Sequence, residues 1–151
     1  MIGDEISCLK NVGSTQLKDA NSKCQSLNAN QILPRSRQES DDLVPALLSL
    51  GLASEDGNML VSIGIYMTNE EWRNSAGQLI SYFNWLPDEP DNIGVNQDHA
   101  GFQIFGVNGT AGWASFSGAA ELNVVCTKKA GQGESITLIM NLNRVLRLSS
   151  K

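Results

Sequence analysis

The chain has few of the residues that support binding to nucleic acid or insertion into a membrane. Its 11 lysines and arginines are outnumbered by 16 aspartates and glutamates, which gives a net charge of −5. A protein with no basic stripe cannot release counterions from a phosphate backbone, so nucleic acid is a disfavoured partner. No apolar run approaches the roughly 18 residues that a membrane helix needs, so we expect no membrane insertion.

The chain also has little that supports catalysis. His99 is its only histidine, and it contains no nucleophile elbow, no zinc-spaced Cys/His set and no phosphate-binding loop. Asp88 and Glu89 are adjacent acids, but adjacent acids in a proline loop are more often solvated than used for acid–base work. We therefore expect a protein that is not an enzyme.

What the chain does have is an acidic, proline-bounded segment. Residues 84–92 read Asn-Trp-Leu-Pro-Asp-Glu-Pro-Asp-Asn. Pro87 and Pro90 fix φ and remove backbone donors, so the segment is neither a helix interior nor a central strand. It is a rigid loop that presents oxygen atoms, which are the ligands of hard cations such as Ca²⁺. An acidic, solvated turn is the alternative interpretation.

Local patterns predict the elements around this loop in a chain of single-domain length, 151 residues. Ser14 or Thr15 can cap a helix that runs to about Leu27. A capping box at residues 36–39 opens a second helix, which contains Pro45 and ends at Gly51. Strands are predicted at residues 5–10, 59–67 and 122–127. Residues 68–112 are rich in Gly, Asn, Asp and Pro and predict a long irregular loop framed by short strands.

The order of these features resembles a C-type lectin-like domain over roughly residues 14–128. The matching motifs are the helix that carries Cys24, the apolar strand 61–65, the Trp-x-x-x-x-Gly turn at 72–77, the Asn-Trp-x-Pro-x-Glu-Pro loop, and Cys126 after Asn-Val-Val. The resemblance implies an α+β fold, with two helices flanking a small antiparallel sheet and a long irregular loop region. We expect this domain at residues 1–129, followed by a C-terminal extension at 130–151.

The same resemblance sorts the three cysteines. It implies a disulfide between Cys24 and Cys126, worth about 4–5 kcal/mol in the chain-entropy model. The family's second bridge would join positions 99 and 118, where this chain has His99 and Gly118, so we expect that bridge to be absent as a unit. Cys8 is then either a buried thiol or a crosslink between two chains.

The resemblance also implies a site for Ca²⁺ and sugar in the long loop. Glu89 stands at the first carboxylate position, Asp91 replaces an amide and Gln97 replaces a second glutamate. After Trp113, the family's Asn-Asp pair is replaced by Ala114 and Ser115. Each lost carboxylate lowers the attraction for a divalent cation.

We therefore expect no metal cofactor in the usual geometry. A weak Ca²⁺ site would use Glu89, Asp91 and Asp98. The residues expected to contact a ligand from the long loop are Glu89, Asp91, Asn92, Gln97, Asp98, Trp113 and Ser115.

The predicted function is extracellular recognition of a glycan or a protein ligand by the long-loop surface, without the usual Ca²⁺ geometry. One alternative is a Ca²⁺-dependent carbohydrate-binding lectin with a rearranged site. Another is a structural or adhesive protein that forms a homodimer through Cys8 or the C-terminal tail. In that tail Ile136, Leu138, Met140 and Leu142 alternate as in a strand, whereas Leu138, Leu142 and Val145 or Leu146 also fit a helix. Secretion is implied by the resemblance, and Asn108 opens the only N-glycosylation sequon.

Overall fold

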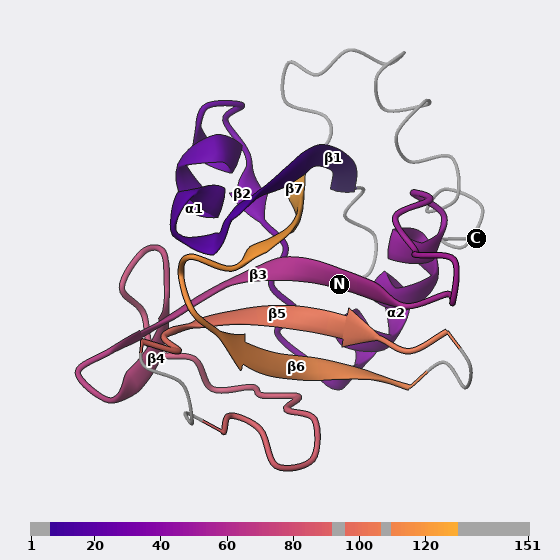
Figure 1. Ribbon diagram of the computed structural model, residues 1–151. Coiled ribbons are helices and arrows are strands. Elements are labelled where there is room, and N and C mark those ends of the chain that lie inside the picture. The colour runs from indigo at the N-terminus through magenta and orange to yellow at the C-terminus, as the bar shows by residue number, and fades with distance from the viewer. Residues whose placement is uncertain (1–6, 92–95, 107–109, 130–151) are drawn as a thin grey trace.

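The computed structural model describes residues 7–91, 96–106 and 110–129, which form two helices and a seven-stranded sheet (Figure 1). In chain order the elements are β1 (Ser7–Gln16), α1 (Leu17–Gln25), β2 (Asn30–Gln31), α2 (Arg37–Leu48), β3 (Met59–Thr68), β4 (Glu71–Asn74), β5 (His99–Ile104), β6 (Ala111–Phe116) and β7 (Glu121–Lys129). Within these ranges, neither helix is long and apolar enough to cross a membrane. Asn92, Asn108 and the extension 130–151 lie outside the described residues.

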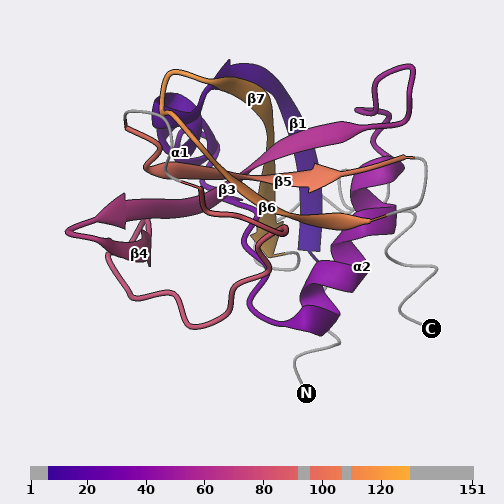
Figure 2. The same ribbon diagram turned by 60° about the horizontal axis from the view of Figure 1, so that its bottom comes forward.

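The strands are hydrogen-bonded in the order β1-β7-β3-β5-β6, with β2 paired to β7 and β4 paired to β3. Most pairs are antiparallel, but β3 and β7 meet in parallel where Val61 pairs with Asn123. The predicted α+β fold is confirmed, and the sheet is mixed and not purely antiparallel. Figures 1 and 2 both show α1 beside β1 and β7, well apart from α2.

The start of α1 differs from its predicted position. Ser14 and Thr15 belong to β1, because that strand stays paired with β7 as far as Gln16 and Glu121. The N-cap residue is Gln16, which makes no side-chain cap hydrogen bond. The first backbone N–H groups of the helix donate to distant carbonyls instead, Leu17 to Ala120 at 2.9 Å and Lys18 to Gly118 at 2.9 Å. The helix therefore begins where tertiary acceptors satisfy its orphan donors.

The start of α2 follows the predicted capping box. Ser36 Oγ accepts a hydrogen bond from the Glu39 N–H at 3.1 Å. The Glu39 carboxylate reaches back to accept from the Arg35 N–H at 2.8 Å. Pro45 lies inside the helix, and Gly51, with φ of 72°, lies in the turn that follows it. Both ends of this helix are thus set by local sequence.

The main core lies between α2, the central strands and the loop that precedes β5. Its largest fully buried side chains include Trp113, Phe102, Leu47, Ile63 and Ile65. This core packs β6 against the loop, so the long-loop residues lie over buried, packed side chains.

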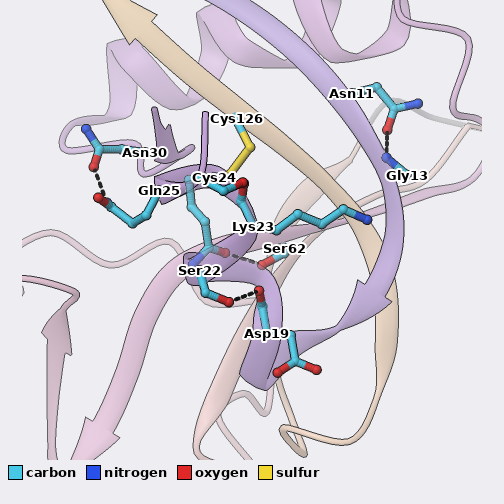
Figure 3. Close-up of a disulfide and its surroundings, with 12 residues drawn as sticks. Asn11, Gly13, Asp19, Ser22, Lys23, Cys24, Gln25, Asn30, Ser62 and Cys126 are labelled. Carbon is cyan, nitrogen blue, oxygen red and sulfur yellow. Dashed lines mark hydrogen bonds between the residues drawn. A yellow bond between two sulfur atoms is a disulfide. The ribbon is translucent and has the colours of Figure 1, made fainter. Parts of the chain in front are cut away.

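A second cluster surrounds the disulfide between Cys24 of α1 and Cys126 of β7 (Figure 3). The predicted pairing is confirmed, with the two Cα atoms 5.4 Å apart and 102 residues between them in sequence. Cys8 is a buried thiol in β1, only 5% exposed. Its burial supports the first of the two alternatives for this residue over a crosslink between chains.

Candidate functional site

The first residues of the acidic loop run alongside β6. Trp113 donates its N–H to the Asn84 carbonyl at 2.7 Å, and Leu86 donates to the Trp113 carbonyl at 2.9 Å. Gly112 permits this approach, since a Cβ atom there would lie 2.7 Å from Leu86 Cδ2. The Asn-Trp-Leu tripeptide thus acts as a short added strand that delivers Glu89 to the far end of β6.

Glu89 is held there by Ser115. The Ser115 N–H donates to Glu89 Oε1 at 2.9 Å, and its hydroxyl lies 3.2 Å from the same oxygen. Glu89 also donates its own N–H to the Leu86 carbonyl at 3.0 Å, and its peptide bond to Pro90 is cis. Two donors from one residue therefore orient this carboxylate.

Asp91 and Gln97 converge on the same hydroxyl. Ser115 Oγ lies 3.4 Å from Asp91 Oδ1 and 3.0 Å from Gln97 Oε1. A hydroxyl carries a single proton, so it can donate to only one of these acceptors and Glu89 at a time. Four of the residues that the sequence predicted, Glu89, Asp91, Gln97 and Ser115, are brought together, and acceptor oxygens outnumber donors among them.

Asp98 is engaged elsewhere. Its Oδ1 lies 2.8 Å from His99 Nδ1, and its backbone carbonyl accepts from the Met67 N–H at 2.8 Å. Within the described ranges, no three His, Cys, Asp or Glu side chains gather into a group that could hold a metal ion. The structure places the Asp98 side chain on His99, and the weak Ca²⁺ site expected from Glu89, Asp91 and Asp98 stays a prediction.

The oxygen ligands that these side chains offer do not fit the Ca²⁺ that the resemblance implies. Around Ser115 Oγ there are two carboxylates and one amide, and the hydroxyl itself is neutral. Ca²⁺ prefers six to eight oxygen ligands with several carboxylates among them. Ser115 supplies a neutral hydroxyl where the family resemblance implies a carboxylate, so it adds no charge to attract a divalent cation.

Trp113 lies in the core and away from the ligand surface where we expected it. The residue is fully buried, with 0% exposure. Its ring packs against those of Tyr82, Phe83 and Trp85 with centroids 5.8, 6.3 and 5.8 Å apart. Its Nε1 has no hydrogen-bond partner in the described structure. Trp113 therefore supports the loop from beneath.

No sequence pattern predicts the surroundings of His99. Tyr66 of β3 pairs with His99 in the strand register, and their rings meet edge to face with centroids 5.2 Å apart. Burial raises the pKa of the Tyr66 phenol above its usual value, while a hydrogen bond from the Gln31 amide opposes the shift. Only the register of β3 against β5 brings these groups together.

Comparison with known proteins identifies the fold. No protein-family model matches the chain, and no curated protein matches it significantly. Among solved structures, the carbohydrate-recognition domain of mouse scavenger receptor C-type lectin matches with a TM-score of 0.67 and 21% identity, covering 85% of this chain and 93% of that one. Human lithostathine matches with a TM-score of 0.65 and 21% identity over 82% of this chain and 84% of that one.

A third similar structure is the C-type lectin domain of murine dendritic cell inhibitory receptor 2 in complex with an N-glycan. It has a TM-score of 0.63 and 17% identity, and the match covers 82% of this chain and 91% of that one. Identities at this level carry the architecture and not the ligand. The protein therefore has the C-type lectin-like fold.

Proposed function

We propose that this protein is an extracellular recognition module, which binds a glycan or a protein ligand through its long-loop surface without the usual Ca²⁺ geometry. The observation that carries the proposal is the position of Ser115. Its N–H and hydroxyl contact Glu89, and the hydroxyl contacts Asp91 and Gln97. A neutral serine thus contacts the loop oxygens at the place where the family resemblance implies a metal.

The chemistry of this cluster favours a ligand that donates hydrogen bonds. Glu89 and Asp91 are carboxylates, which only accept hydrogen bonds, so they suit a partner that donates them. Sugar hydroxyls and the N–H groups of a protein partner both supply such donors. Hydrogen bonds to charged acceptors contribute about 1.5–3 kcal/mol each.

Two further observations support the proposal. Two of the similar structures are named as a carbohydrate-recognition domain and as a complex with an N-glycan, which are statements about those proteins. The disulfide between Cys24 and Cys126 suits an oxidising compartment such as the cell exterior. Glycosylation at Asn108 falls outside the described residues and stays a prediction.

A glycan array probed in Ca²⁺ and in chelator tests the proposal, with two matched variants. Glu89→Gln and Asp88→Asn each remove one charge and keep the side-chain shape, but only Glu89 contacts Ser115. We expect binding that survives chelation, weakens about tenfold in Glu89→Gln and stays within about twofold in Asp88→Asn. Tight Ca²⁺ binding to wild type in a calorimetric titration, or equal effects of the two variants, would refute it.

The Ca²⁺-dependent lectin remains the second candidate. It is favoured by the contact of Glu89, Asp91 and Gln97 with one hydroxyl. If the Ser115 side chain rotated away, three side-chain oxygens would surround the space that its hydroxyl now occupies, and a cation could bind there. Elution from a sugar column by chelator would identify this function.

An adhesive protein assembled through Cys8 and the tail is a third candidate. Comparison of reducing and non-reducing gels would distinguish it.

A further inference from the structure

A groove lies between α2 and the start of β6, at the opposite end of that strand from Ser115. Its volume is about 510 Å³, and its walls include Arg37, Ser40, Asp41, Pro45, Asn84 and Ala111. Figure 2 shows α2 beside the end of β6 at which the strand begins. The volume is in the range of small-ligand sites. The proposed function does not use this groove.

The floor of the groove is an uncovered stretch of sheet edge. β6 is the last strand of the sheet and pairs with β5 on one side only. Alternate residues of such a strand point their peptide groups outward. Trp113 is one of them, because its N–H and carbonyl bond to Asn84 and Leu86. Ser115 is another, since its N–H bonds to the Glu89 carboxylate.

Ala111 is the third outward-facing residue of β6. The neighbouring Thr110 carbonyl points inward, where it accepts from the Phe105 N–H at 2.8 Å, which confirms the alternation. The outward N–H and carbonyl of Ala111 form no hydrogen bond with any other described residue. Two of the three outward positions on β6 are thus covered, and the uncovered one lines the groove.

Polar side chains stand next to this free peptide group. Ser40 of α2 is 2% exposed, and its hydroxyl accepts from Asn84 Nδ2 at 3.2 Å. That bond leaves Asn84 Oδ1 without a partner in the described residues. Arg37 and Asp41 form an exposed ion pair of 3.2 Å on the rim. The groove therefore presents both hydrogen-bond donors and hydrogen-bond acceptors, from the backbone and from side chains.

We propose that this groove binds an extended peptide segment of a protein partner, which adds a short strand to β6 at Ala111. A peptide backbone is the ligand that offers a donor and an acceptor at strand spacing, and addition to a free sheet edge is a common mode of peptide recognition. A sugar is a poorer fit, because none of the described residues that line the groove has an aromatic ring on which a sugar could stack.

The test uses a variant that removes one backbone donor. Ala111→Pro deletes the outward N–H, which takes no part in the β5–β6 ladder, and proline is tolerated at such edge positions. Ala111→Ser keeps the N–H and serves as the matched control. Short random peptides displayed on phage are selected on the full-length wild-type chain, and the selected peptides are measured by calorimetry. Circular dichroism and thermal unfolding check that each variant folds.

We expect the selected peptides to bind Ala111→Pro about tenfold more weakly and Ala111→Ser within about twofold of wild type. Methylation of one backbone nitrogen of the peptide should weaken binding to wild type in the same way. This second measurement keeps the test decisive if the proline variant does not fold. Binding that survives both changes, or a library that yields no binding peptide, overturns the proposal.

Two other occupants are outcomes of the same experiment. Glycan-array signals that vanish in Ala111→Pro would assign the groove to a sugar. A fall in molar mass of that variant by light scattering would assign it to a second copy of the chain. Either result overturns the peptide proposal but leaves the long-loop site, which is tested through Glu89, unaffected.

Discussion

His99 packs directly against Gly118, so closely that a Cβ atom at position 118 would lie 2.8 Å from His99 Cε1. These are the two positions at which the family resemblance places the missing second bridge. The start of β5 and the turn after β6 are therefore brought together without a covalent bond. An imidazole ring fills the space, with its Nδ1 on Asp98 and its ring edge-to-face with that of Tyr66.

A methyl group at position 118 should destabilise the protein through this contact. We expect Gly118→Ala to lower the free energy of unfolding by about 1–3 kcal/mol, the usual cost of overpacking. The same change in a His99→Ala background should cost much less, because the ring that it meets is gone. Denaturant unfolding of the four proteins measures the coupling. Additive effects would show that His99 is not the group that excludes a side chain from 118.

Cysteines at both positions should form the absent bridge. His99→Cys combined with Gly118→Cys is expected to oxidise on purification and to raise the free energy of unfolding by about 3 kcal/mol, the chain-entropy value for a loop of similar size. Mass spectrometry of non-reduced peptides identifies the bond, and His99→Cys alone is the control. Two cysteines that stay reactive toward a thiol reagent would show that the backbone separation is too large.

A third carboxylate at position 115 should create a response to Ca²⁺. Ser115→Asp places its charge beside Glu89 and Asp91, which contact the present hydroxyl. We expect a lower melting temperature in chelator through charge repulsion, and a recovery with Ca²⁺ of about 2.7 kcal/mol at a hundredfold excess over Kd. Ser115→Asn, which adds an amide oxygen but no charge, should respond far less. Identical melting of Ser115→Asp with and without Ca²⁺ would contradict this prediction.

Trp113 should matter for stability and not for ligand contact. Because the ring is fully buried, Trp113→Ala should cost about 3–5 kcal/mol of unfolding free energy. Phe83→Ala removes a neighbouring ring that is 40% exposed and should cost less. Chemical denaturation followed by circular dichroism compares the two. A Trp113→Ala protein that stays stable but no longer binds its ligand would contradict this prediction and show that Trp113 contacts the ligand.

Stability should fall at alkaline pH through Tyr66. Burial raises the pKa of this phenol in the folded state above its usual value of 10.0. Ionisation is therefore easier in the unfolded chain, so the stability linked to Tyr66 is fully present below pH 10.0 and is lost as the pH rises through the folded-state pKa. Wild type should lose stability above pH 10.0 more steeply than Tyr66→Phe. Tyr82→Phe controls for the loss of a hydroxyl elsewhere, and parallel curves for wild type and Tyr66→Phe would refute the assignment.

The parts of the fold that could be predicted depend on residues close together in sequence. The capping box that begins α2 needs only Ser36 and Glu39, and the apolar run from Met59 predicts β3 with little outside information. The start of α1 could not be placed in this way. Its first N–H groups are satisfied by Ala120 and Gly118, which lie about a hundred positions further along the chain.

The candidate site divides along the same line. Glu89, Asp91, Gln97 and Ser115 were predicted from the order of motifs and do meet around one hydroxyl. Asp98 was predicted with them but contacts His99 instead, and Trp113 is buried. Which partner Asp98 contacts and how deeply Trp113 is buried both depend on tertiary packing. Neither could be derived from a pattern of residue types.

The sequence by itself determined the two helices, the disulfide between Cys24 and Cys126 and the loss of carboxylates after Trp113, because each depends on which residue stands at a given place in an ordered series. Tertiary structure alone decided that Ser115 holds Glu89, that His99 fills the space beside Gly118 and that Ala111 keeps an open edge. Those relationships are hydrogen bonds and contacts between strands and loops, whose partners are chosen only when the chain has packed.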